Sequence, residues 1–201
     1  MSEKEAYRLF EETKTRNGLV LAEVTSSLQK SIRRGWTEKA CEFAYEIYTS
    51  SPLLLDHLWT RLMTISVEDI GFGNKEVMGQ VYMLNEVRKN FPYKSVDQPI
   101  FFIHAIRLMC ESEKDRSSDL LKNIVIKKFA MGYTPEIPEI ALDKHTRRGR
   151  AAGKDSFHFF HEASKVIPQA EINNDYRQRY EEILKVYDPK KIKEDAFKFD
   201  I

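Results

Sequence analysis

The positions of glycine and proline constrain the fold of this chain more than any other feature. Both residue types disfavour the interior of a helix. They divide the sequence into stretches of about helix length, and only Gly79 interrupts such a stretch. The other breakers are Gly18, Gly35, Pro52, Gly71, Gly73, Pro92, Pro99, Gly132, Pro135, Pro138, Gly149, Gly153, Pro168 and Pro189. This spacing predicts a series of helices joined by turns.

Apolar residues inside these stretches recur every three or four positions, which is typical of amphipathic helices. The pattern covers residues 21–32, 40–47, 55–65, 160–167 and 176–187. Residues 100–110 are apolar on most sides, so we expect a central, buried helix there. No run of alternating apolar and polar residues is bounded by hairpin turns, and we predict an all-α fold that forms a single helical bundle.

Capping residues mark several helix starts. Ser51 precedes Pro52, whose missing N–H costs nothing at the first helical position, because that group has no partner inside the helix. Asp97 and Asp155 also precede apolar stretches and predict two further starts.

The length of 201 residues indicates one domain, or one domain with a small appendage. We expect a helical N-terminal extension over residues 1–18, a helical domain over residues 19–168, and a C-terminal helix and tail over residues 169–201. Residues 131–153 have no helical period and hold three glycines and two prolines, which predicts an ordered surface loop. The residues from Lys190 onward are expected to fray.

Composition excludes several classes of protein. Hydrophobic residues make up 42% of the chain and charged residues 31%, which argues against disorder. No apolar run approaches the ~20 residues that span a bilayer, and residues 1–5 lack the order of a secretory signal, so we expect no membrane partner. Two cysteines are too few for a disulfide scaffold and favour a reducing cytoplasm. With a formal net charge of +1, any contact with nucleic acid requires a local patch.

Residues 142–154 are the most basic segment. They contain His145 and five cations opposed by Asp143 alone, the cations being Lys144, Arg147, Arg148, Arg150 and Lys154. Guanidinium groups match phosphate oxygens, and two glycines let a ligand approach the backbone closely, so the segment predicts a surface that binds DNA or another phosphate. The alternative is a solvated basic loop that pairs with acidic neighbours or with a subunit partner.

The same segment lacks the features of a P-loop. Too few residues separate Gly149 from Gly153, Asp155 follows Lys154 where Ser or Thr would hold Mg²⁺, and no strand precedes it. We therefore predict no nucleotide-hydrolysis site and no cofactor.

A second basic cluster, Lys30, Arg33 and Arg34, precedes Gly35 at the end of a predicted helix. Cations in the last turn offset the negative helix terminus, and the glycine supplies a left-handed cap. We favour this capping role, with a supporting phosphate contact as the alternative.

Glu68 and Asp69 are adjacent carboxylates. Neighbouring side chains on a helix point about 100° apart, so the two do not converge on a metal. We predict a structural ion pair, with Arg33 or Arg34 as the expected partner.

Histidine and cysteine residues offer no complete catalytic or metal site. His158 and His161 share one helical face, but they lack the spacing and the internal glutamate of a zinc protease motif. Cys41 and Cys110 lie in apolar helical stretches, where packing explains them better than nucleophilic catalysis. We predict no metal ligand and no catalytic residue.

Three short motifs carry a family resemblance: SLQKSIRRG at residues 27–35, LWTRL at 58–62 and SVEDIG at 66–71. In this order and spacing they resemble the C-terminal region of the RarA/MgsA group of AAA+ ATPases, which are relatives of the clamp loaders. The resemblance covers about residues 19–130, and ALDKHTRRGR at 141–150 is similar to short proteins related to that region.

The resemblance implies an all-helical, collar-like fold that assembles into tetramers, in proteins that act at stalled replication forks. It also implies DNA, or a separate replication or AAA+ protein, as a partner. The chain contains neither Walker motif, so ATP hydrolysis does not carry over.

Two functions remain open. We favour a non-enzymatic helical module for oligomerisation and binding, associated with DNA replication or repair, in which the basic segment contacts DNA. The alternative is an enzyme that acts on a phosphorylated small molecule or nucleotide, with the arginines as an anion pocket and His145 as the acid or base.

Overall fold

The structure is a computed structural model, and it describes residues 10–188 and residue 191. The chain forms two compact units that divide between Tyr133 and Thr134, inside the predicted segment 19–168. The described residues contain helices and no sheet, which confirms the all-α prediction, and their β pairing is an isolated bridge between Lys14 and Val20. None of the described helices has both the length and the apolar character needed to span a bilayer.

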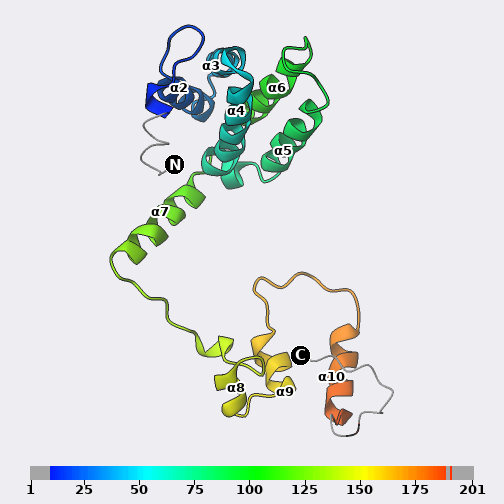
Figure 1. The fold of residues 1–201 in the computed structure, drawn as a ribbon. Helices are drawn as coiled ribbons and strands as arrows, with labels where there is room; N and C mark the ends of the chain where they lie inside the picture. The colour runs from blue at the N-terminus through cyan, green and yellow to red at the C-terminus, as the bar shows by residue number, and fades with distance from the viewer. Residues whose placement is uncertain (1–9, 189–190, 192–201) are drawn as a thin grey trace. The chain divides into compact units, whose positions relative to one another are not determined.

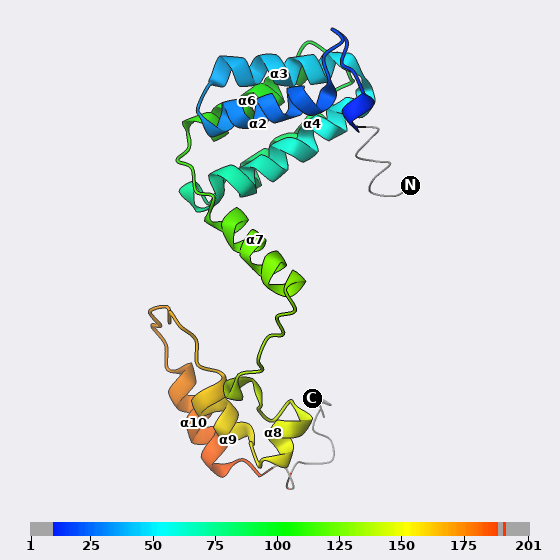
Figure 2. The same ribbon diagram turned by 90° about the vertical axis from the view of Figure 1, so that its left-hand side faces the viewer.

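Unit 1 is a bundle of helices built around a continuous apolar core (Figure 1). Its elements are α2 (Leu21–Arg33), α3 (Thr37–Ser50), α4 (Pro52–Ile65), the π-helix η1 (Ser66–Ile70), the 3₁₀ turn η2 (Gly71–Gly73), α5 (Val77–Arg88), α6 (Gln98–Glu111) and α7 (Ser117–Ala130). Helix α3 packs against α2, α4 and α6, and α5 packs against α6. Figure 2 shows α2, α3 and α4 together on one side of this bundle.

The predicted apolar faces form this core. Leu28 of α2, Ile47 of α3 and Leu62 of α4 are fully buried, and Trp59 is 1% exposed. Helix α6 contains the predicted buried segment, but only one face of it is enclosed, because Ile100 is 58% exposed. The expectation that residues 100–110 are buried on most sides was therefore too strong.

All three predicted helix starts are confirmed, and two of them have a side-chain capping hydrogen bond. The Ser51 hydroxyl accepts a hydrogen bond from the backbone N–H of Leu53 at 3.2 Å, and the Asp155 carboxylate accepts one from His158 at 3.0 Å. Asp97 stands before α6 but makes no capping hydrogen bond through its side chain.

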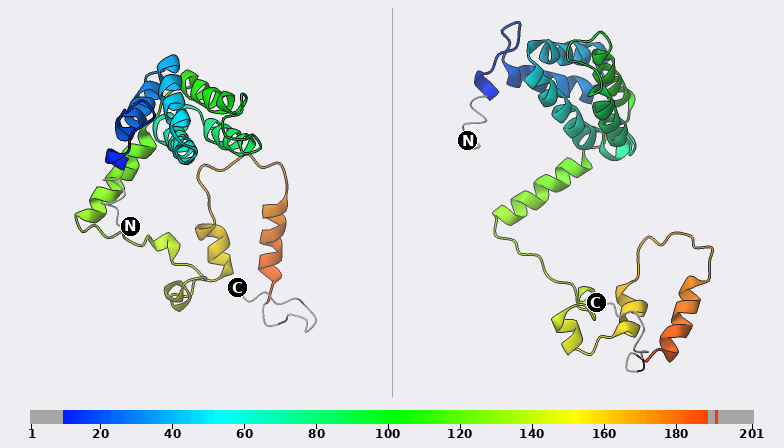
Figure 3. Two further views of the ribbon diagram at one scale, coloured as in Figure 1. Left: turned by 45° about the horizontal axis from the view of Figure 1, so that its top comes forward. Right: turned by 45° about the vertical axis from the view of Figure 1, so that its right-hand side comes forward.

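Unit 2 is assembled from short helical pieces (Figure 3). They are the 3₁₀ turn η3 (Glu139–Ala141), α8 (Arg147–Ala151), α9 (Ser156–His158), the π-helix η4 (Phe159–Ala163) and α10 (Tyr176–Val186). Among the described residues of this unit, one hydrophobic side chain is buried, that of Phe160.

Two predictions about the ends and loops need comment. Residues 131–153, expected to be loop, contain η3 and α8, because α8 is started by a capping turn rather than by an apolar face. Residues 1–9 of the predicted N-terminal extension lie outside the described residues. So do residues 190 and 192–201 of the segment expected to fray.

Candidate functional site

The basic segment is organised around a capped turn. Thr146 Oγ1 accepts a hydrogen bond from the Gly149 N–H at 3.0 Å and donates one to the Asp143 carbonyl at 3.1 Å. The Asp143 carboxylate in turn accepts from the backbone N–H of His145 at 2.9 Å and lies 3.1 Å from its ring Nδ1. These hydrogen bonds from His145 lower the pKa of Asp143. The single carboxylate of the segment is thus occupied within the turn.

Gly149 turns the arginines outward. It is buried, and a Cβ at this position would overlap the backbone of Asp143, so α8 lies directly against the turn that starts it. Successive helical residues are rotated by about 100°, so the residues on either side of Gly149 point away from that contact. Arg147, Arg148 and Arg150 are exposed accordingly. We call these three side chains the arginine surface.

The guanidinium groups of the arginine surface form no ion pair within 4 Å of a carboxylate of the described residues, although the charge of Arg148 helps to lower the pKa of Glu139. Arg150 Nη1 donates to the backbone carbonyl of Lys144 at 3.1 Å, which fixes its side chain across the turn. A guanidinium carries more donors than this one contact uses, so it remains able to bind an anion.

The two lysines of the segment are engaged elsewhere. Lys154 Nζ lies 2.5 Å from Glu139 Oε1, and its hydrogen bond is the main cause that lowers the pKa of Glu139. Lys144 Nζ lies 3.4 Å from Ser156 Oγ and 5.4 Å from the centre of the Phe159 ring. Lys144 and Lys154 therefore help to hold the turn together, and the arginine surface carries the accessible charge.

Two histidines of unit 2 lie against aromatic rings. The His145 ring meets Phe159 edge-on at 4.9 Å, and the His161 ring lies 4.1 Å from that of Phe157. His158 Nδ1 and His161 Nε2 are buried and have no hydrogen-bond partner among the described residues. No group of three or more His, Cys, Asp or Glu side chains in the described part of the chain is arranged to hold a metal ion.

Both cysteines are poor nucleophiles. Cys41 is half-buried and Cys110 is buried, and burial raises the pKa of each thiol. A raised pKa reduces the thiolate fraction that nucleophilic attack requires.

The second basic cluster lies in the last turn of α2, and this helix ends in a Schellman motif. Gly35 has a φ of 69°, its N–H bonds the Ile32 carbonyl at 3.0 Å, and the Trp36 N–H bonds the Ser31 carbonyl at 2.9 Å. Lys30 bonds the hydroxyl of Ser26. The glycine therefore has the capping geometry that the sequence suggested.

Arg33 is directed into the bundle rather than to solvent. Its Nε lies 2.7 Å from Oδ1 of Asp69, which is fully buried, and its Nη2 lies 3.7 Å from Glu68 Oε1. Asp69 thus pairs with one of the two partners that the sequence analysis named. The carboxylates occupy Arg33, which leaves Lys30 and Arg34 as the exposed cations of this cluster.

Two further partners of these carboxylates were missed by sequence reasoning. Arg116 Nε lies 3.1 Å from Asp69 Oδ1, and Gln29 Nε2 donates to Asp69 Oδ2 at 2.9 Å. Arg116 also lies 2.5 Å from Asp119 in the first turn of α7. The buried carboxylate therefore joins α2, η1 and the start of α7. No local pattern pointed to Arg116, because it lies far along the chain from Asp69.

Gly71 allows this junction to close. It has a φ of 50°, and a Cβ there would overlap the carbonyl oxygen of Asp115. The Asp115 N–H donates to the carbonyls of Asp69 and Ile70, each at 3.1 Å. The SVEDIG motif therefore acts as a structural joint in this protein.

Comparison with known proteins adds no family to these observations: no family model matches the chain, and no curated protein matches it significantly.

Proposed function

We propose that this chain is a non-enzymatic helical module that self-associates and contacts the phosphate backbone of DNA. The observation that carries the proposal is the arginine surface: three exposed guanidiniums on one short helix, without a carboxylate partner among the described residues. The resemblance to the C-terminal region of the RarA/MgsA group supports a place in DNA replication or repair.

Phosphate contacts explain why guanidiniums suit this position. Arginine binds phosphate oxygens through two parallel hydrogen bonds and keeps its charge at every physiological pH. Each neutralised phosphate releases counterions, so three contacts predict a salt dependence with a log–log slope of roughly −3 per chain. Three contacts alone give weak binding, and assembly of several copies would multiply them on one DNA molecule.

Helix α7 supports self-association. Its residues Leu120, Leu121, Ile124, Val125 and Phe129 are 46–61% exposed, whereas Asp119 is its buried residue. These five side chains cover about half of the helix circumference, and a single 14-residue helix is marginal in water without packing. Asp119 is held by Arg116 and Lys122 away from this face, so the face that a partner would cover is apolar. We therefore propose a second copy of this chain as the occupant of the α7 face.

Charge reversal tests the contact with DNA. In the double variant Arg147→Glu and Arg148→Glu, we expect loss of duplex binding in a low-salt fluorescence-anisotropy titration, with unchanged helicity by circular dichroism. The matched control, Lys89→Glu with Arg107→Glu, makes the same change in net charge on exposed residues of unit 1 and should retain most of the affinity. Equal affinity of both variants and the native protein would refute the proposal.

Self-association is tested by light scattering coupled to size-exclusion chromatography. The native protein should exceed its chain mass of 23.6 kDa at micromolar concentration, and Leu121→Glu with Val125→Glu should return it to the monomer. A native protein that stays at the mass of one chain would overturn this part of the proposal.

One observation favours a second candidate function. The Asp143–His145 contact of 3.1 Å orients an exposed imidazole beside the arginine surface, as an acid–base site for a phosphorylated substrate would require. A phosphatase screen with and without added divalent metal tests it. Turnover that disappears in His145→Ala would replace the non-enzymatic proposal.

A further inference from the structure

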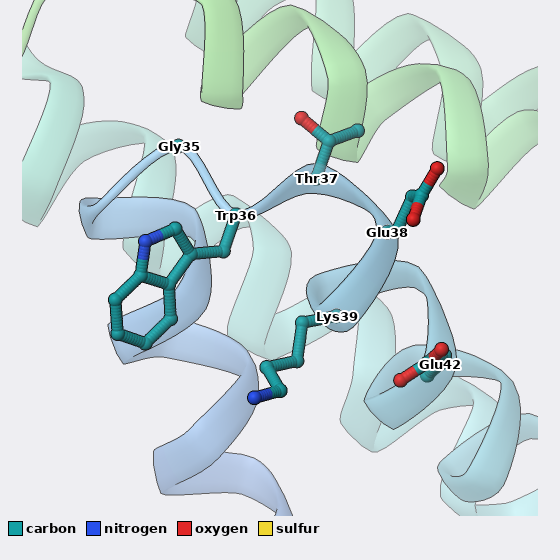
Figure 4. A pocket seen from close by; sticks show the side chains of 6 residues that line it. All are labelled: Gly35, Trp36, Thr37, Glu38, Lys39 and Glu42. Atoms are coloured by element: carbon teal, nitrogen blue, oxygen red, sulfur yellow. The ribbon is translucent and has the colours of Figure 1, made fainter.

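Trp36 is a large aromatic side chain left open to solvent in unit 1. It is 53% exposed, whereas Trp59, the other tryptophan, is 1% exposed. The backbone of Trp36 is fixed by its hydrogen bond to Ser31 in the Schellman motif, so the indole projects from a rigid turn between α2 and α3 (Figure 4). Rigid, exposed aromatic rings of this kind are typical of recognition surfaces.

Two cations lie over this ring. Arg34 Cζ is 5.5 Å and Lys39 Nζ is 5.8 Å from the ring centre, within the range of cation–π contacts. Figure 4 shows Lys39 extending on the same side of the turn as Trp36. Neither cation, nor Lys30 one turn before Arg34, forms an ion pair with a carboxylate of the described residues. Both side chains are exposed, and apart from the ring Arg34 makes a long hydrogen bond of 3.4 Å to the Lys30 carbonyl, so each can also bind an anion.

A hollow beside the indole has room for a planar ligand. Its volume is about 440 Å³, and residues 35–39 together with Glu42 line it. Glu38 and Glu42 are four residues apart on α3, so they share a helix face. Figure 4 shows Glu38 and Glu42 on the side of the turn away from the indole, so they do not face a phosphate bound beside the ring.

We infer that Trp36 is a stacking platform for one base of a single-stranded nucleic acid, and this inference rests on the proposed function. The base lies on the indole within the hollow, and the flanking phosphates bind Arg34 and Lys39. An aromatic platform flanked by cations is the arrangement that single-strand binding requires, because every base has a π face and every linkage has a charge.

The test compares variants of the full chain by fluorescence anisotropy with labelled oligo(dC). Trp36→Ala should weaken binding about tenfold, and Trp36→Phe, which keeps a ring, should restore most of it. Phe72→Ala is the matched control, because Phe72 is also exposed in unit 1 and carries Lys75 at 5.9 Å from its ring. Unchanged affinity of Trp36→Ala, or equal weakening by Phe72→Ala, would overturn the inference.

Tryptophan emission gives a second readout. Stacking should quench the native protein on titration with oligo(dC), and Trp36→Phe should abolish the quenching, because Trp59 is buried. Quenching that persists in Trp36→Phe would contradict the platform.

The same variants separate this inference from the proposed function. Trp36→Ala should leave duplex binding intact, whereas reversal of Arg147 and Arg148 should abolish it. If only the arginine variant loses affinity, for both kinds of DNA, the stacking platform fails and the proposed function survives. If the arginine variant keeps its affinity for duplex DNA while Trp36→Ala loses affinity for oligo(dC), the proposed role of the arginine surface is wrong and the stacking platform stands.

Discussion

The two units of this chain achieve order in different ways. Unit 1 encloses a continuous apolar core with fully buried side chains from α2 to α6. Unit 2 buries Phe160 among its described residues and is organised by local contacts, such as the Thr146 cap and the Lys154–Glu139 ion pair. Segments of this size without a core are marginal in water. The difference indicates that unit 1 is stabilised by its own core, whereas unit 2 depends on local contacts.

The largest difference in unfolding free energy between the two units should come from truncating one buried phenylalanine in each unit. Phe102 is fully buried in α6, so Phe102→Ala should cost about 3–5 kcal/mol of unfolding free energy. Phe160→Ala in unit 2 should leave the same transition nearly unchanged. Both tryptophans belong to unit 1, so their fluorescence in a urea titration reports that unit alone. A large loss in Phe160→Ala would show that the units unfold together.

A smaller effect is expected at Gly71 and Gly149, which are two of the glycines that allow close backbone approach. Gly71→Ala places a Cβ against Asp115 at a positive φ and should destabilise unit 1 by roughly 1–3 kcal/mol. Gly149→Ala meets Asp143 in the same way, but it should distort the turn beneath the arginine surface without moving the urea midpoint of unit 1.

Gly79 supplies the control for these substitutions. It lies inside α5 with open space around its missing Cβ, so Gly79→Ala should stabilise unit 1 by about 0.5–1 kcal/mol. Destabilisation at all three positions would mean that the effect is not one of close approach. Loss of duplex binding in Gly149→Ala alone would tie the turn to the proposed contact with DNA.

The contrast between the units also explains how far sequence reasoning reached. Helices α2, α3, α4 and α6 were predictable because each buries an apolar face, which leaves a period in the sequence. Helix α8 was not, because its start depends on Thr146 and its packing on a glycine rather than on apolar residues.

The site residues were also predictable only where the sequence carries a local signal. The basic segment was visible as a local excess of charge, but only the fold shows that Lys154 is paired and that the arginines are exposed. The approach of Arg116 to Asp69 depends on how η1 and α7 meet, and no local pattern encodes that contact. Sequence reasoning did not identify Trp36. The residues around it in the sequence do not indicate that a tryptophan after the capping glycine is exposed to solvent.

The smallest effect is a difference in acid sensitivity. In unit 1, burial lowers the pKa of His57, which lies 3.0 Å from Thr25 Oγ1. The unfolded chain then binds a proton more readily than the folded chain as the pH falls below the ordinary value near 6.5. Stability of unit 1 should therefore decline between about pH 7 and pH 5.

Unit 2 should respond in a more acidic range. Hydrogen bonds lower the pKa values of Glu139 and Asp143, so their stabilising contribution persists above the ordinary values of 4.5 and 3.8 and is lost only as the pH falls below them.

Urea midpoints from tryptophan fluorescence at pH 7.5 and 5.5 test the prediction for unit 1, and His57→Gln should reduce the difference between the two midpoints. Amide hydrogen exchange at residues 143–149 tests the prediction for unit 2, since protection should hold at pH 5.5 and fall near pH 3.5. Loss of protection already at pH 5.5 would contradict this assignment, because a group other than the two carboxylates would then control the turn.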